Sequence, residues 1–288
     1  MNRAGSFFEL TKPRITFFVL MSTAVGFAFG AHLAPAWSWM QLVHALLGTW
    51  LIASGTAALN QWYESEPDAQ MARTRRRPIP SGRLTTMQAF WFGAALSAAG
   101  FTELCLGVNL LTGLLGLFTL ASYLFVYTPL KRVSPVSTTI GAIPGAMPPL
   151  IGYAAACGHL NFEAGILYAI LFLWQFPHFY AIAWMYREDY ARAGILMLPV
   201  VEPDGDSTAR RILWFSLALV PMSLAPSFFA MAGRVYLFGA LVLGALVIST
   251  GFRVASQRTR LRARQVLLAS VVYLPLLYGL LVLDGTHL

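Results

Sequence analysis

The stretch LNQWYESEPDAQMARTRRRPIPSGR, from Leu59 to Arg83, separates two apolar runs and concentrates polar chemistry between them. Within it, Asn60, Glu64 and Asp68 recur every four residues, a spacing that in a helix stacks three oxygen-bearing side chains on one face. Five arginines follow, at positions 73, 75, 76, 77 and 83. Oxygen ligands suit a hard cation such as Mg²⁺, and arginines suit phosphate. The stretch therefore predicts a membrane helix that ends in a site for a metal-bound diphosphate.

The composition is that of an integral membrane protein. Of 288 residues, 57% are hydrophobic and 11% are charged, and the mean hydropathy is +0.63, whereas a soluble domain carries about 25% charged residues. The formal charge of +8 would suit nucleic acid, but the bases lie in short loops between apolar runs, as the positive-inside rule expects. We therefore expect one membrane domain over residues 1–288 and no nucleic-acid partner.

The apolar runs predict an all-α fold. A hydrocarbon core needs roughly 20 apolar residues per helix. Nine stretches come close to that length: 15–33, 39–59, 87–107, 109–128, 136–157, 163–185, 212–231, 235–252 and 265–283. The fifth contains IGAIPGAMPPLIG (Ile140–Gly152), whose prolines and small residues predict a kinked, closely packed helix.

The basic residues predict how these helices are oriented. Every second loop is basic, and the alternate loops carry only Arg234. The basic loops should therefore face the cytoplasm, with the N-terminus inside and the C-terminus outside. This places a multi-pass protein in the cell inner (cytoplasmic) membrane, with its site on the cytoplasmic side. The arginines from Arg258 to Arg264 fit a topogenic, lipid-facing basic turn.

A second loop resembles the first in its position and its acids. The segment LWQFPHFYAIAWMYREDYARAGILMLPV (Leu173–Val200) follows the sixth span as the first loop follows the second, so both should emerge on one face. It carries Glu188 and Asp189, and a third turn on that face carries Lys131 and Arg132. Two acidic clusters could hold Mg²⁺ ions that bridge to phosphate oxygens. Ion pairs at a surface are the alternative explanation of such acids.

One histidine differs in its setting from the others. His178 lies inside the sixth span, in Trp174-Gln175-Phe176-Pro177-His178-Phe179, about two turns before Glu188. A neutral imidazole at that depth could ligate a haem iron or move a proton, and a packing role is the alternative.

At these positions the chain resembles the intramembrane prenyltransferases of the UbiA superfamily. The resemblance rests on Asn-x-x-x-acid-x-x-x-Asp, which begins at Asn60, and on the turn Tyr-x-x-x-Lys-Arg, which begins at Tyr127. Stretches 54–83, 127–153 and 173–200 are similar to the haem-farnesylating branch. In the second motif the wider superfamily has acids where this chain has Tyr186 and Tyr190, with Glu188 and Asp189 between them. The haem branch shares that form.

The resemblance implies nine helices around a central cavity, farnesyl diphosphate and haem b as substrates, and Mg²⁺ as cofactor. It implies that Asn60, Glu64 and Asp68 form the first diphosphate–metal motif and that Lys131 and Arg132 bind the diphosphate. In the second motif it leaves open which acid touches the metal, with Asp189 as the first choice and Glu188 as the second, and both are candidate catalytic residues. Further candidates for binding the diphosphate are Arg73, Arg77, Tyr127, Tyr186, Arg187 and Tyr190. Because His178 lies inside the sixth span, Trp174, Gln175 and His178 are expected to bind haem. The product would pass to a haem A synthase or to terminal oxidase assembly.

The implied reaction joins the farnesyl carbon to a haem vinyl group. The diphosphate leaves, the vinyl carbon attacks the allylic cation, and water captures the cation beside the porphyrin, which gives haem O. Two other functions remain open at this point. One is a UbiA-type enzyme with another aromatic acceptor, such as a quinone precursor, and the other is a non-enzymatic haem transporter.

Overall fold

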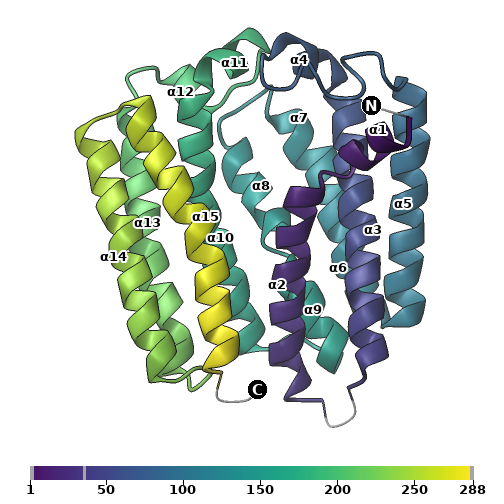
Figure 1. The fold of residues 1–288 in the computed structure, drawn as a ribbon, viewed down its shortest axis with the longest axis vertical. Coiled ribbons are helices and arrows are strands. Elements are labelled where there is room, and N and C mark those ends of the chain that lie inside the picture. The colour runs from purple at the N-terminus through teal and green to yellow at the C-terminus, as the bar shows by residue number, and fades with distance from the viewer. Residues whose placement is uncertain (1–2, 35–36, 286–288) are drawn as a thin grey trace.

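The computed structural model describes residues 3–34 and 37–285, which form a bundle of helices (Figure 1). Within these ranges nine helical spans are long and apolar enough to cross a membrane, as the sequence predicted. They are α2 (Pro13–Ala31), α3 (Trp39–Tyr63), α5 (Thr86–Gly107), Leu110–Leu130, Ser137–Cys157, α10 (Phe162–Met185), α13 (Asp206–Phe228), α14 (Arg234–Ser256) and α15 (Arg260–Leu283).

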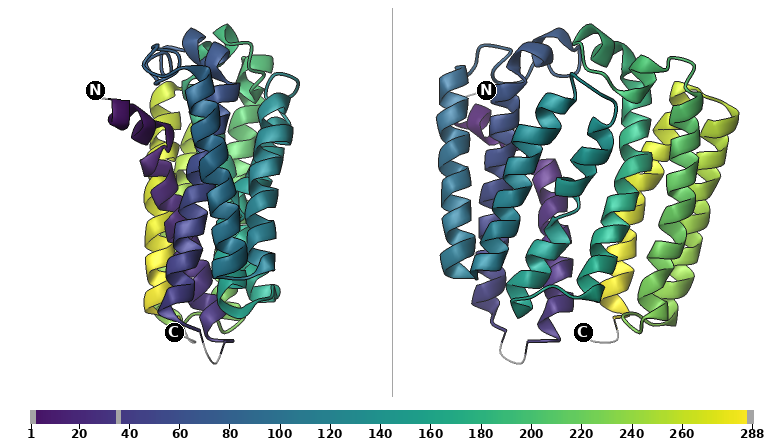
Figure 2. Two further views of the ribbon diagram at one scale, coloured as in Figure 1. Left: turned by 90° about the vertical axis from the view of Figure 1, so that its right-hand side faces the viewer. Right: turned by 180° about the vertical axis from the view of Figure 1, so that it is seen from behind.

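Two of these spans are interrupted. The fourth consists of α6 (Leu110–Ala121), the π-helix η1 (Ser122–Tyr127) and α7 (Thr128–Leu130). The fifth consists of α8 (Ser137–Gly145) and α9 (Pro148–Cys157). The other short helices are α1 (Arg3–Leu10), α4 (Ser65–Gln70), α11 (Arg187–Arg192) and α12 (Leu198–Val201). All four lie at one end of the bundle, which we call the polar end, and the opposite end is the far end (Figures 1 and 2).

Several helices begin or end beyond the predicted apolar runs. The seventh span starts at Asp206 rather than 212, the ninth starts at Arg260 rather than 265, and α3 continues to Tyr63 rather than 59. Hydropathy marks only the part of a helix at lipid depth, whereas local caps mark where the helix begins. Ser38 and Thr85 each form a capping box with a glutamine three residues later, which satisfies two of the first free N–H groups.

The predicted kink in the fifth span is confirmed. Helix α8 ends at Gly145, and α9 starts at Pro148 after a break of two residues. Proline removes a backbone donor, and the carbonyls that this frees need other partners inside a membrane. Helix α10 supports the region of the break, because Gln175 Nε2 donates at 3.0 Å to the Ala142 carbonyl, which also accepts from the Ala146 N–H.

Glycine lets α2 and α9 pack backbone to backbone. A Cβ on Gly152 would lie 1.8 Å from the Thr23 carbonyl oxygen, and one on Gly26 would lie 2.0 Å from the Pro149 oxygen. In lipid, close contact between small residues replaces the hydrophobic effect as a source of helix association. The two glycines therefore fix the position of the first span against the fifth.

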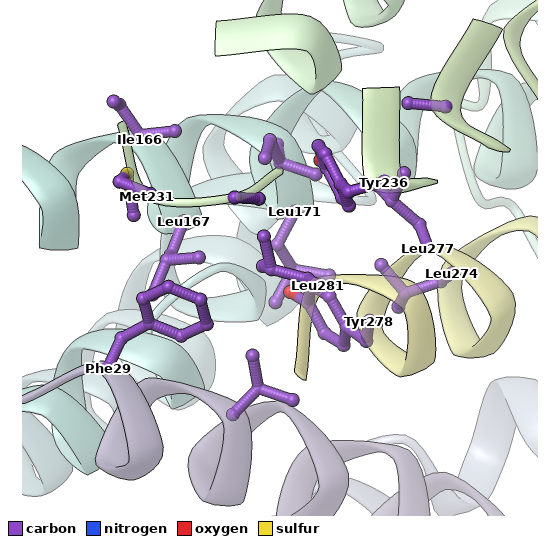
Figure 3. Packing of buried hydrophobic residues seen from close by; sticks show 14 of the residues in the cluster. Phe29, Ile166, Leu167, Leu171, Met231, Tyr236, Leu274, Leu277, Tyr278 and Leu281 are labelled. Carbon is purple, nitrogen blue, oxygen red and sulfur yellow. The ribbon is translucent and has the colours of Figure 1, made fainter. Parts of the chain in front are cut away.

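A compact core closes the far end of the bundle. Figure 3 shows Phe29 from α2, Leu167 and Leu171 from α10, and Tyr278 and Leu281 from α15 gathered in one buried cluster. Buried tyrosines need hydrogen-bond partners, and Tyr236 Oη donates to the Ser223 carbonyl at 2.6 Å. Toward the polar end the ribbons of α2 and α15 diverge (Figure 1).

The packing of α2 against α9 gives a first prediction. Gly152→Ala should lower the thermal unfolding midpoint in detergent, because overpacking of a tight contact costs about 1–3 kcal/mol. Gly165→Ala is the matched control, since no atom beyond its own turn of helix lies within 4 Å of a Cβ there, and it should melt at or above the wild-type temperature. A Gly152→Ala protein as stable as Gly165→Ala would contradict the close contact.

Candidate active site

The first acidic motif sits where α3 ends. Asn60 is in the last turn of α3, Glu64 caps it, and Asp68 belongs to α4. The three residues therefore do not share one continuous helix, because the backbone leaves helical geometry at Glu64, with φ −95° and ψ 15°. The i, i+4 hydrogen bonds nevertheless continue, from Glu64 N to Asn60 O and from Asp68 N to Glu64 O, each at 2.9 Å.

A chain of hydrogen bonds links this motif to two lysines. Lys131 Nζ lies 2.8 Å from Glu64 Oε1, Asn60 Nδ2 donates to Glu64 Oε2 at 2.8 Å, and Lys12 Nζ donates to Asn60 Oδ1 at 3.1 Å. The Lys131 and Glu64 side chains are only 10% and 12% exposed. The whole protein has only two lysines, and both lie in this hydrogen-bonded network.

Burial and charge perturb both ends of this hydrogen-bonded chain. Burial alone raises the pKa of the Glu64 carboxyl, but Lys131, Lys12 and Asn60 together hold that pKa below its ordinary value. Burial, and then the charge of Arg77, lower the pKa of the Lys12 ammonium to about 7. Glu64 is therefore ionised at neutral pH, whereas Lys12 gains or loses its proton near neutrality.

The π-helix η1 explains how Lys131 reaches the motif. Its wider turn precedes Thr128 and places the rings of Tyr123 and Tyr127 beside Lys131, whose Nζ lies 6.0 and 4.4 Å from the two centroids. Such π-turns are frequent at functional sites, and the aromatic faces stabilise the ammonium. Sequence periodicity did not indicate this turn.

The two acidic loops contact each other at the polar end. The Ala72 and Arg73 backbone N–H groups each donate to an oxygen of Asp189 at 3.4 Å, and Arg192 forms an ion pair with the same carboxylate. Burial raises the pKa of Asp189, but these two N–H groups and Arg192 hold it below its ordinary value. The common position predicted for the two loops is confirmed by these contacts.

Arginines of the first loop face both motifs. Arg77 Nη1 lies 2.6 Å from Oδ2 of Asp68, whose side chain is 1% exposed. Arg73 donates to Tyr190 Oη at 3.3 Å and lies over the Tyr186 ring, 5.2 Å from its centroid. Tyr186 and Tyr190, which stand where the superfamily has acids, thus bind the guanidinium group of Arg73.

Three predicted residues lie at the margin of this cluster. The Glu188 side chain is 85% exposed, which favours Asp189 as the acid nearer the site. Arg187 donates to the Trp184 carbonyl and packs on its ring, and Arg132 is exposed.

The donor set suits Mg²⁺ held jointly with phosphate oxygens. In the described residues no three His, Cys, Asp or Glu side chains converge as a complete metal site. Mg²⁺ usually binds through one or two carboxylates together with water and substrate phosphates. Glu64, Asp68 and Asp189 supply such hard oxygens, and Asn60 supplies an amide oxygen.

Two of the three expected haem residues, Trp174 and His178, lie about two to three turns before the end of α10, on its face toward α15. His178 Nδ1 lies 2.9 Å from Ser270 Oγ, and its ring stacks on Trp174 at 4.8 Å. With the Ser270 hydroxyl donating to the Leu267 carbonyl at 2.7 Å, Ser270 Oγ accepts from Nδ1–H. In this tautomer Nε2 keeps its lone pair. Gln175, 3% exposed, holds α8 instead.

Lys12 is the site residue that the sequence analysis missed. As a base before the first span it fits the positive-inside rule alone, yet its Nζ lies 3.1 Å from Asn60 Oδ1. Its backbone is left-handed, with φ 49° and ψ 58°, where α2 begins. The rarity of lysine in a chain with 20 basic residues was the signal available.

Comparison with known sequences gives a family and several relatives. The model of the UbiA prenyltransferase family matches residues 19–275. A protoheme IX farnesyltransferase of Solibacter usitatus is 61% identical over 285 residues, covering 96% of this chain and 98% of the relative. One of Koribacter versatilis is 48% identical over 287 residues, covering 96% and 92%.

Solved structures share the fold. A structure reported for digeranylgeranylglyceryl phosphate synthase superposes with a TM-score of 0.81 at 16% identity and covers 100% of both chains. A UbiA homologue from Archaeoglobus fulgidus bound to GPP and Mg²⁺ gives a TM-score of 0.65 at 16% identity, covering 96% of this chain and 99% of the other.

The lowered pKa of Lys12 predicts pH-dependent anion binding. As pH rises through about 7, Lys12 loses its proton, and affinity for inorganic diphosphate with Mg²⁺ should fall about tenfold, since charged hydrogen bonds contribute about 1.5–3 kcal/mol. Lys12→Arg keeps its charge and should flatten this profile in calorimetry. Both proteins are measured in the same buffers, so the titration of the diphosphate itself contributes equally to both profiles. Identical pH profiles for the two proteins would exclude Lys12.

Proposed function

This chain belongs to the UbiA prenyltransferase family, and we propose on that premise that it transfers a farnesyl group from farnesyl diphosphate to a vinyl group of haem b. Water is added to the product, which is haem O, and diphosphate is released. The high identity to protoheme IX farnesyltransferases over nearly the whole chain supports this acceptor over others.

The meeting of four segments at the polar end is the observation that supports the diphosphate site. The start of α2, the end of α3, the turn after α7 and the first turn of α11 contribute Lys12, Glu64, Lys131 and Asp189. Surface ion pairs do not require such convergence, and the Glu64 and Lys131 side chains are largely buried. Acids and bases interleaved in this way offer ligands both to a cation and to phosphate oxygens.

We assign Mg²⁺ to Asn60, Glu64, Asp68 and Asp189. When bound, the ion supplies Lewis-acid stabilisation of the diphosphate leaving group. Lys131 lies beside Glu64 and Lys12 beside Asn60, so both are placed to bind phosphate oxygens of a diphosphate held there, and Arg73 and Arg77 border them. These cations stabilise negative charge as the carbon–oxygen bond breaks. The tyrosines around Lys131 limit access of water to the allylic cation.

We assign the haem acceptor to the face of α10 that carries Trp174 and His178. The unprotonated Nε2 of His178 is suited to an axial position on iron, and the indole of Trp174 offers an apolar surface to the macrocycle. Nε2 makes no hydrogen bond to any residue that the structure describes. A packing histidine would be expected to use both nitrogens.

The wider setting is also part of the proposal. Residues 1–288 form one domain, which lies in the cell inner membrane with the polar end on the cytoplasmic side. The excess of bases at the polar end supports this orientation. Haem O would then be passed to a haem A synthase or to terminal oxidase assembly.

The proposed reaction predicts a specific product. Membranes with the protein, haem b, farnesyl diphosphate and Mg²⁺ should form haem O by mass spectrometry. Glu64→Gln and Asp68→Asn should each lower its rate at least about a hundredfold, because metal stabilisation of a leaving group is worth several kcal/mol. Glu66→Gln is the control, since Glu66 is an exposed acid of the same loop.

The same assay separates the alternatives. Farnesylation of a labelled hydroxybenzoate but not of haem would indicate another aromatic acceptor. Haem binding without any release of diphosphate would indicate a transporter. Near-normal rates in both acid variants would contradict the first motif.

The haem assignment has its own test. His178→Ala should change the optical spectrum of bound haem and sharply lower haem O formation, while binding of farnesyl diphosphate is retained. Ser270→Ala should give a weaker change of the same kind, because Nδ1 loses its acceptor. His159→Ala, at an exposed position, is the control. An unchanged spectrum with unchanged turnover in His178→Ala would assign His178 to packing.

A further inference from the structure

A pocket of ≈ 420 Å³ lies between the polar ends of α10 and α15. It is lined by Met185, Tyr186, Arg260, Leu261 and Arg264. The two arginines are one helical turn apart, so they project from the same face of α15, and both are exposed. Met185 and Leu261 give the pocket an apolar surface beside these two cations. We call it the carboxylate pocket, for reasons given below.

The two arginines differ from their neighbours in having no protein partner. Arg258 forms an ion pair with Asp206, and Arg262 donates to Gln257 and Gln265. Among the described residues, none forms a hydrogen bond or ion pair with the side chain of Arg260 or Arg264. The positive-inside rule accounts for the number of arginines in this turn, but not for two unpaired guanidinium groups in the wall of one pocket.

The pocket adjoins both proposed substrate sites. Tyr186 lines it and also lies under Arg73 of the diphosphate site. Met185 lies seven residues beyond His178 on the same face of α10, which corresponds to about 10 Å along the helix. A flat ligand with its centre at His178 therefore has its edge near the pocket.

We infer that Arg260 and Arg264 bind the two propionate carboxylates of the haem substrate. Haem b is apolar over most of its surface and carries its two carboxylates on one edge, and the pocket pairs an apolar wall with two guanidinium groups on adjacent turns. Arginine binds carboxylates through paired hydrogen bonds. The inference rests on the proposed haem acceptor and adds how that acceptor is oriented.

The proposed contact can be tested from both sides, because the arginines can be replaced in the protein and the carboxylates can be esterified in the ligand. With purified protein in phosphatidylcholine nanodiscs, Arg260→Gln/Arg264→Gln should raise the KM for haem b about tenfold or more, with the KM for farnesyl diphosphate unchanged. The dimethyl ester of haem b should show the raised KM already in the wild type. The double variant should show the same KM for haem b and for its dimethyl ester.

Arg253→Gln/Arg262→Gln removes the same charge from the same end of α14 and α15 and should leave the KM for both forms of haem unchanged. The inference is overturned if the double variant of Arg260 and Arg264 still prefers the acid to the ester. The inference is also overturned if the raised KM of this double variant appears only in nanodiscs that contain phosphatidylglycerol, because that result would assign the arginines to anionic lipid. Absence of haem O formation by the wild type would instead contradict the proposed function.

Discussion

Lipid offers no hydrogen bonds to a peptide, and the rest of this structure follows from that constraint. Each backbone N–H and C=O at membrane depth needs a partner within the protein, so the chain crosses as helices. Side chains add further hydrogen bonds to backbone carbonyls of the interrupted fifth span. Gln175 Nε2 donates to the Ala142 carbonyl near the end of α8, and Asn109 Nδ2 donates to the Ala154 carbonyl of α9. The interruption at η1 places Lys131 beside Glu64. The departures from regular helix thus lie close to the proposed sites.

The same constraint determines where charge can be placed. Charged side chains at the membrane boundary are costly unless they are paired, and here each acid of the diphosphate site has a base beside it. Glu64 faces Lys131, Asp68 faces Arg77 and Asp189 faces Arg192. A metal-bound diphosphate carries both signs of charge, so it can engage the acids through the cation and the bases through its oxygens. The charge balance that keeps this region folded is therefore also suited to its substrate.

The far end and the polar end have different roles in this arrangement. The cluster around Phe29 and Tyr278 joins α2, α10 and α15 at the far end (Figure 3), whereas the ribbons of α2 and α15 diverge toward the polar end (Figure 1). Ser270 fixes one nitrogen of His178, and the carboxylate pocket lies between this pair and the polar surface. Rigid packing at one end can thus hold the walls of a site that admits two large substrates at the other.

Sequence alone determined the nine spans and the acidic motifs, because hydropathy and four-residue spacing are local properties. It also indicated that both acidic loops share one end, since the spans alternate in direction. Several features depended on tertiary structure. The helix breaks at Glu64, Lys12 joins the site with a pKa lowered to about 7, and Tyr186 separates Arg73 from a pocket with two unpaired arginines. The contacts of Lys12 and Tyr186 join residues many positions apart in the sequence. Their distances are set by helix packing, which no local pattern in the sequence records.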